Sequence, residues 1–267
     1  MLIIGELINA TRKPVKEAVT NRDAAFLQEL ARKQDEAGAH YIDVNVATGQ
    51  GKQEQEIEYM DWAVKLIREV SQKPLCIDTT SREVLEAGLK AHGPGAMVNS
   101  ASAEKGRLEP FLRLAGEFGC LLIALPVADA GIPRDTETRL KIAREILDAA
   151  QKEGFPRKNL YFDPLVLPLG VDDKGGKVTL KTLRLFKEEL GVKTAIGLSN
   201  ISHGLPRRAL LNRTFLTLAM REGLDSALMD PLDNAVMSSL LATRAFMGED
   251  SYCGKYLRAY RSGRLVN

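Results

Sequence analysis

The sequence predicts an α/β protein of the (β/α)8 TIM-barrel class. Short runs of β-branched and aliphatic residues recur along the chain, and a helical pattern follows each. Eight such runs cover residues 2–9, 40–47, 74–80, 96–102, 121–127, 160–166, 194–200 and 226–232. Their near-continuous apolar character is typical of parallel strands buried on both faces, and 267 residues suit one barrel. A doubly wound open sheet uses the same local units and remains the alternative.

The segments between these runs have the pattern of amphipathic helices with recognisable ends. Asp23 is a candidate N-cap, and Gly38 is expected to end the helix that follows it. Thr80 and Glu83 have the spacing of a capping box. Further helical patterns cover residues 106–118, 135–152, 179–190, 207–220 and 234–247. Because no linker-like stretch divides the chain, residues 1–267 are expected to form one domain.

Composition excludes several classes of function. Lys and Arg number 37 against 35 Asp and Glu, and no basic stripe is present, so we expect neither nucleic acid nor a membrane as partner. No apolar run approaches the roughly 18 residues of a membrane span, and the first residues lack the pattern of a secretion signal. The three cysteines and three histidines are scattered without metal-ligand spacing. These features predict a soluble cytoplasmic protein with no bound metal.

Polar side chains appear where the apolar runs end, which is where a barrel of this class carries its active site. They are Glu6, Asn9, Asp43, Asn45, Asp78 with Thr79 and Thr80, Asn99 with Ser100, Asp163, Ser199 with Asn200, and Asp230. Hardly any cation accompanies them, which suits a neutral, donor-rich heterocycle better than a phosphorylated sugar. Arg207, Arg208 and Arg213 are expected to form a solvated helix face or salt bridges, and a substrate clamp is the alternative. Residues 170–177 are the nearest approach to a phosphate-binding loop, and we interpret them as a solvated loop.

Each of these polar residues also has a purely structural interpretation. An Asp or Asn at a strand end often caps a helix or closes a loop, and this alternative stays open for Asp43 and Asn45. Asp78 and Asn99 lie inside apolar runs, where an unpaired polar group is costly, so a functional role is favoured. For Asp163, which precedes a proline, the alternative is a buried structural turn.

Taken together, the strand ends resemble those of the pterin-binding family. The matching segments are residues 2–9, 42–46, 75–80, 97–100, 161–165 and 197–202. Residues 211–216 and 219–225 narrow the resemblance to the methyltetrahydrofolate:corrinoid protein methyltransferases. The similarity runs from the first residue to about residue 230 and implies a barrel like that of dihydropteroate synthase. At position 7 this chain has Leu where many family members have Arg.

The resemblance implies roles for individual residues. Asp78, Asn99 and Asp163 would hydrogen-bond the polar edge of the pterin ring. Asn200 would lie close to N5 of the pterin and act in catalysis, with Asp78 as its partner. The remaining expected pterin-binding residues are Gly197, Ser199, Glu6, Asn9, Asp43 and Asn45.

The activity that the resemblance implies is methyl transfer between N5 of tetrahydrofolate and the cobalt of a corrinoid. Tetrahydrofolate or methyltetrahydrofolate would be a substrate, and a separate corrinoid protein would carry the cobalamin, because the chain lacks an Asp-x-His-x-x-Gly motif. A homodimer is also implied. Two alternatives remain: a condensing enzyme like dihydropteroate synthase, and a non-catalytic pterin-binding or folate-binding protein. Residues 229–231 read Met-Asp-Pro where the synthases have Arg-x-His, which disfavours the first.

Overall fold

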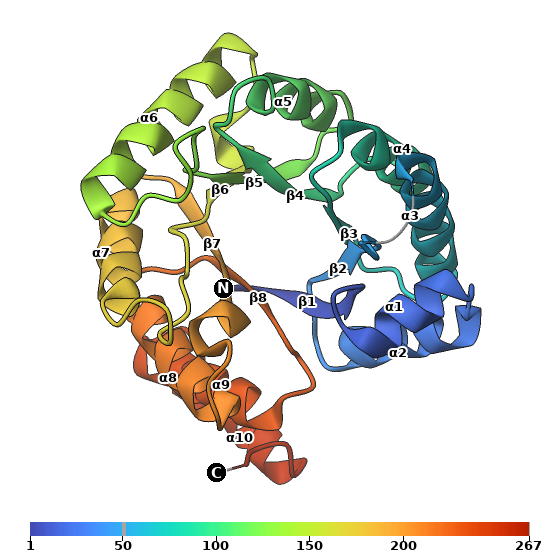
Figure 1. Cartoon of the computed structure of the whole chain (residues 1–267). Helices are drawn as coiled ribbons and strands as arrows, with labels where there is room; N and C mark the ends of the chain where they lie inside the picture. Colours follow the sequence, from blue (N-terminus) through green and yellow to red (C-terminus); the bar gives the residue numbers. More distant parts are fainter. Residues whose placement is uncertain (50–51, 267) are drawn as a thin grey trace.

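The computed structural model describes residues 1–49 and 52–266, and its strands form a closed parallel barrel in sequence order (Figure 1). Pairing of β1 with β8 closes the ring. The strands are β1 (Leu2–Asn9), β2 (Tyr41–Asn45), β3 (Leu75–Asp78), β4 (Met97–Ser102), β5 (Leu121–Leu125), β6 (Leu160–Phe162), β7 (Lys193–Gly197) and β8 (Ser226–Met229). The (β/α)8 prediction is therefore confirmed, and the open-sheet alternative is wrong.

The helices surround the barrel as an outer ring, and the chain ends beyond it (Figure 1). They are α1 (Lys13–Thr20), α2 (Ala24–Glu36), α3 (Gln53–Arg68), α4 (Arg82–His92), α5 (Leu108–Glu117), α6 (Thr136–Lys152), α7 (Gly175–Glu188), α8 (Arg208–Arg221), α9 (Asn234–Phe246) and α10 (Gly254–Arg261). Three short 3-10 helices, η1 (Arg157–Asn159), η2 (Leu198–Ser202) and η3 (Ser251–Cys253), join them. Within the described part of the chain, no helix is long and apolar enough to cross a membrane.

Two layers of apolar side chains hold the barrel together. The outer layer fills the space between the strands and the helices. The inner cluster of buried residues comes from strands alone, as expected for the interior of a small barrel. Its members are Ile4, Cys76, Met97, Ile123, Tyr161 and Ala195. Because side chains alternate along a strand, the side chain two positions after each of these also points into the barrel. It lies one layer nearer to the carboxyl end of the barrel.

Most predicted element ends agree with the structure. The Asp23 side chain accepts a hydrogen bond from Phe26 N, as expected of an N-cap, and Gly38 follows the end of α2 with φ of 94°. The capping prediction for Thr80 is wrong, because Ser81 is the N-cap of α4 and its Oγ accepts from Val84 N. Thr80 lies one residue too early in the chain for that bond.

The longest disagreements follow β6, β7 and β8, and predicted strand 226–232 ends at Met229. Predicted strand 160–166 ends at Phe162, because Pro164 cannot continue the ladder. Predicted strand 194–200 ends at Gly197, where the chain turns into η2. The solvated-loop interpretation of residues 170–177 is wrong at its end, because α7 begins at Gly175. A turn at residues 169–174 precedes that helix.

Candidate active site

The carboxyl end of the barrel opens into a cavity of about 660 Å³. Nine of the ten predicted site residues line it: Glu6, Asn9, Asp43, Asp78, Asn99, Asp163, Gly197, Ser199 and Asn200. The strand period explains most of this list. Glu6, Asp78, Asn99, Asp163 and Gly197 each follow a member of the inner cluster by two positions, so they share its orientation and form the next layer upward.

Two acid–amide pairs join neighbouring strands on one side of the cavity. Asn99 Nδ2 donates to Asp43 Oδ1 at 3.2 Å, linking β4 to β2. Asn45 Nδ2 donates to Asp78 Oδ2 at 2.9 Å, linking β2 to β3. Asn45 does not line the cavity itself. Its side-chain oxygen Oδ1 accepts a hydrogen bond from Ala47 N at 3.0 Å. Asn45 therefore supports Asp78 from behind, which corrects its predicted position at the cavity wall.

Burial shifts the ionisation of this group toward the protonated form. Desolvation raises the pKa of Asp43 well above its usual range, and the charge of nearby Asp78 raises it further. Desolvation also raises the pKa of Asp78 to about 6, opposed by the hydrogen bond from Asn45. The buried Cys76 thiol forms a hydrogen bond with Asp43 from below. Burial of the two neighbouring carboxyl groups therefore favours the protonated form of Asp43 more strongly than that of Asp78.

Asp163 closes the opposite side of the cavity, directly after β6. Its Oδ1 accepts from Leu165 N at 2.7 Å, so the carboxylate does close a turn, as the structural interpretation expected. It also lines the cavity, so the two interpretations are compatible. Burial raises the pKa of Asp163 to about 6, against the opposing effects of the Leu165 N–H and the Arg139 charge. Within the described chain, Oδ2 has no hydrogen-bond partner and remains available to a ligand.

Glu6 and Ser199 join the first strand to the loop after the seventh. Ser199 Oγ donates to Glu6 Oε1 at 2.5 Å, and Arg12 Nη2 lies 3.3 Å from the same oxygen. Arg12 thus supplies the cation that Leu7 does not. Burial raises the pKa of Glu6, and the Ser199 bond and the Arg12 charge act against that shift. Asn9 anchors this loop, because its Oδ1 accepts from the N–H and the hydroxyl of Thr11.

The Asn200 amide reaches over Gly197 at the rim of the cavity. A Cβ on Gly197 would lie 2.8 Å from Asn200 Nδ2, so glycine is required for this approach. Asn200 is exposed, and its side chain forms no hydrogen bond within the described residues. An amide without a partner at the mouth of a cavity is able to donate to, or accept from, an atom of a bound ligand.

Sequence reasoning missed the cations at the cavity mouth. The two arginines Arg12 and Arg208 line it, together with His203, Thr11, Ser100, Leu125 and Leu228. The expectation that Arg208 belongs to a solvated face is wrong in this respect, since Nη2 donates to Ser199 O at 2.7 Å and Nε to Ser202 Oγ at 3.0 Å. Its position just after a strand-seven loop was the available signal, because such loops line the mouth of a barrel.

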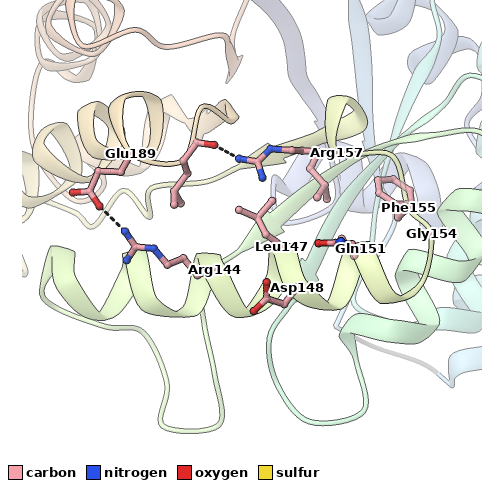
Figure 2. Close-up of a pocket in the computed structure, with 11 residues that line it drawn as sticks. Arg144, Leu147, Asp148, Gln151, Gly154, Phe155, Arg157 and Glu189 are labelled. Atoms are coloured by element: carbon pink, nitrogen blue, oxygen red, sulfur yellow. Dashed lines mark hydrogen bonds and ion pairs between the residues drawn. The ribbon is translucent and has the colours of Figure 1, made fainter.

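A second cavity of about 640 Å³ lies at the other end of the barrel, between the ends of α6 and α7 (Figure 2). Both of its arginines are already bound by other groups of the protein. Arg144 contacts Glu189 at 2.5 Å, and the Arg157 guanidinium donates to the carbonyl oxygen of Leu190. The perturbed carboxyl groups lie instead at the carboxyl end, so we place the active site there.

The arrangement at the carboxyl end suits a flat, polar heterocycle. Carboxylates of Asp78 and Asp163 offer acceptors, while the amides of Asn99 and Asn200 offer both donors and acceptors. In residues 1–49 and 52–266 there is no group of three His, Cys, Asp or Glu side chains placed to hold a metal ion.

Comparisons with known proteins agree with this chemistry. The methylcorrinoid:tetrahydrofolate methyltransferase of Eubacterium limosum is 34% identical over 270 residues, which cover 99% of this chain and 98% of that protein. Methionine synthase of Mycobacterium leprae is 30% identical over 244 residues, covering 86% of this chain and 20% of that protein.

Solved structures of dihydropteroate synthases share the fold. The enzyme from Vibrio fischeri ES114 has a TM-score of 0.72 at 17% identity, with 92% of this chain and 93% of that chain covered. The enzyme from Stenotrophomonas maltophilia has a TM-score of 0.69 at 20% identity, with 92% of each chain covered. The profile of the pterin-binding enzymes matches residues 5–230. The chain therefore belongs to the pterin-binding enzyme family.

Proposed function

We propose that this protein is a methyltransferase that moves a methyl group between N5 of tetrahydrofolate and the cobalt of a corrinoid protein. The observation that carries the proposal is the unpartnered Asn200 amide above a cavity ringed by Asp78, Asn99 and Asp163. The relative from Eubacterium limosum, similar along the whole chain, supports this reaction class. The likeness to dihydropteroate synthases lies below 25% identity and supports the fold alone.

In this proposal the cavity orients the pterin. Asp163 accepts N–H bonds from the amino-pyrimidinone edge through its free oxygen, and Asn99 and Asp78 meet the opposite ring atoms. Asp43 and Asn45 hold Asn99 and Asp78 in place rather than touching the ring. Glu6, Asn9 and Ser199 fix the loops at the mouth, and Gly197 leaves space for the Asn200 amide.

Asn200 acts at the nitrogen that gains or loses the methyl group. When the methyl leaves N5, the electron pair of the N–C bond stays on N5, and Co(I) supplies the pair for the new cobalt–carbon bond. A tertiary amine is a poor leaving group unless it is protonated or hydrogen-bonded. The amide stabilises N5 by donating to its lone pair or by accepting from its proton. In the opposite direction, the N5 lone pair attacks the methyl group, cobalt keeps the electron pair of the broken cobalt–carbon bond, and the proton of N5 is released to solvent.

The partners follow from the same proposal. A separate corrinoid protein presents its cobalamin over the barrel mouth, and the chain itself holds neither a corrinoid nor a metal. We place the protein in the cytoplasm, without a nucleic acid or membrane partner, as one pterin-binding domain over residues 1–267. We also propose that it is a homodimer.

An anaerobic absorbance assay tests the reaction. Purified protein is mixed with methylcobalamin and tetrahydrofolate, and loss of the methyl–cobalt band is followed together with formation of methyltetrahydrofolate. Enzyme-dependent loss of the band supports the proposal. If neither free methylcobalamin nor a panel of methylated corrinoid proteins reacts, while tetrahydrofolate binding is measurable, the protein is a folate binder and the proposal is wrong. Condensation of a pterin pyrophosphate with p-aminobenzoate would instead identify a synthase.

A further inference from the structure

Arg139 on α6 is a fully buried cation, with 0% of its surface exposed. Its guanidinium donates to three backbone carbonyls. Nε binds Pro133 O at 2.9 Å, and Nη1 binds Pro164 O at 2.6 Å and Leu165 O at 3.0 Å. These carbonyls belong to the loops after β5 and β6, both at the mouth of the barrel. A buried arginine is costly unless its hydrogen bonds and charge are used, so its position requires an explanation.

The turn that Arg139 holds is the one that carries Asp163. Leu165 has φ of 65°, a left-handed conformation that a leucine rarely adopts. Its N–H donates to Asp163 Oδ1 at 2.7 Å, so the strained residue sets the direction of that carboxylate. Its carbonyl accepts from Arg139 and from Thr179 Oγ1, the latter at 2.9 Å. Two donors from two helices therefore hold this turn in place.

Arg139 also supplies the positive charge that faces Asp163. The carboxylates around the guanidinium are Asp163, Asp135 and Asp172, and the first has the strongest effect on it. Burial raises the pKa of Asp163 to about 6; the Leu165 N–H and the Arg139 charge keep it from rising further. Removing the charge would leave Asp163 more protonated at neutral pH, and a protonated carboxyl accepts hydrogen bonds poorly.

We propose that Arg139 is a positioning residue for pterin recognition, which holds the turn of Asp163 and places a positive charge near its carboxylate without touching the ligand. This inference rests on the proposed function only in taking a reduced pterin as the ligand. It concerns binding, so it is tested without any corrinoid.

The experiment measures tetrahydrofolate binding by calorimetry between pH 5 and pH 8, under anaerobic conditions, for the wild type and three variants. Arg139→Met removes the charge and the fork of donors. Arg139→Lys keeps the charge and loses the fork. Thr179→Val is the matched control, because it removes one neutral hydrogen bond to the same Leu165 carbonyl. Circular dichroism and thermal midpoints establish which variants fold.

Arg139→Met is expected to weaken binding at pH 7 at least about tenfold and to move its acid limit upward by about one pH unit. Thr179→Val is expected to weaken binding by about two- to fivefold without moving that limit. Arg139→Lys should keep the wild-type limit and bind with intermediate affinity. In turnover, these changes should raise KM and leave kcat nearly unchanged.

The result that overturns the inference is an acid limit that stays in place in Arg139→Met. If that variant does not fold, Arg139→Lys decides: wild-type affinity would show that the fork is unnecessary, and a shifted limit would show that the charge does not set it. Absence of binding by the wild type would instead contradict the pterin-binding proposal itself.

Discussion

At the scale of single residues, the site is built from carboxyl groups whose ionisation the fold has shifted. Burial raises the pKa of both Asp78 and Asp163 to about 6. A hydrogen bond from Asn45 opposes this rise at Asp78, and one from Leu165 N opposes it at Asp163. An acceptor for pterin N–H groups must be ionised to perform well. The site therefore works near the lower limit of the pH range in which its carboxylates are charged.

This predicts that tetrahydrofolate binding weakens as the pH falls through about 6. The carboxyls are ionised above that value and protonated below it, so affinity is retained at pH 7 and lost toward pH 5. Each required carboxylate contributes about tenfold per pH unit below its pKa. Calorimetric titration across this range measures the effect. Affinity that is constant from pH 7 to pH 5 would contradict the role of both carboxylates.

Asn200 is the residue whose loss should affect rate more than binding. Asn200→Ala is expected to leave tetrahydrofolate affinity nearly unchanged and to slow methyl transfer by about a hundredfold, or about 3 kcal/mol of barrier. Asn200→Asp is the matched variant, because it retains the acceptor and loses the donor. Single-turnover absorbance measures the transfer step. A collapse in affinity with an unchanged rate would exclude Asn200 from the chemical step.

At the scale of elements, the change from β7 to η2 positions the side-chain amide of Asn200. Gly197 ends the strand with φ of −80° and ψ of 93°, a conformation open to any residue. Its lack of a side chain matters for another reason, because Asn200 Nδ2 occupies the space that a Cβ would meet at 2.8 Å. The chain thus uses glycine here for proximity rather than for backbone freedom.

Gly197→Ala is expected to displace the Asn200 amide without unfolding the barrel, since the obstacle is the end of a flexible side chain. Methyl transfer should slow by about tenfold or more while the thermal midpoint stays close to that of the wild type. Gly116→Ala on α5 is the control, because its new Cβ would meet Phe155 at an ordinary 3.7 Å. Equal rates for Gly197→Ala and the wild type would show that the amide does not need this position.

At the scale of the whole molecule, apolar side chains gather outside the barrel on the last two helices. Phe246 at the end of α9 is 95% exposed, and Tyr252 and Tyr260 are 99% and 70% exposed. A groove of about 300 Å³ lies beside Phe246, and Phe246 and Tyr256 form part of its wall. Exposed aromatic side chains beside an apolar groove are typical of an interaction site. We assign it to the second subunit of the proposed homodimer.

Light scattering should therefore give a mass near twice the 29.3 kDa of one chain. Phe246→Asp is expected to increase the fraction of monomer, because it places a charge where an apolar contact is required. Val171→Asp is the control, because Val171 is an apolar residue that is 75% exposed and lies outside this surface. It should leave the mass unchanged. A wild-type protein that is monomeric at all concentrations would contradict the dimer.

The sequence by itself predicted eight strand–helix units and the polar residues at the strand ends, and closure of the barrel was decided by the structure. Asp78, Asn99 and Asp163 stand where apolar runs give way to polar residues, and the structure brings all three to the wall of one cavity. Eight apolar runs in order then bring the strand ends to one mouth. Local periodicity was sufficient to predict the strands and helices, because each of these elements depends on neighbours along the chain.

Only the tertiary structure decided which side chains from loops and helices join that mouth. Arg12 and Arg208 reach Glu6 and Ser199 because the loops after the first and seventh strands fold toward each other. Arg139 looks in the sequence like any surface arginine on an amphipathic helix, yet it is fully buried. The path of a loop and the rotation of a helix depend on packing against distant residues, and no local period encodes them.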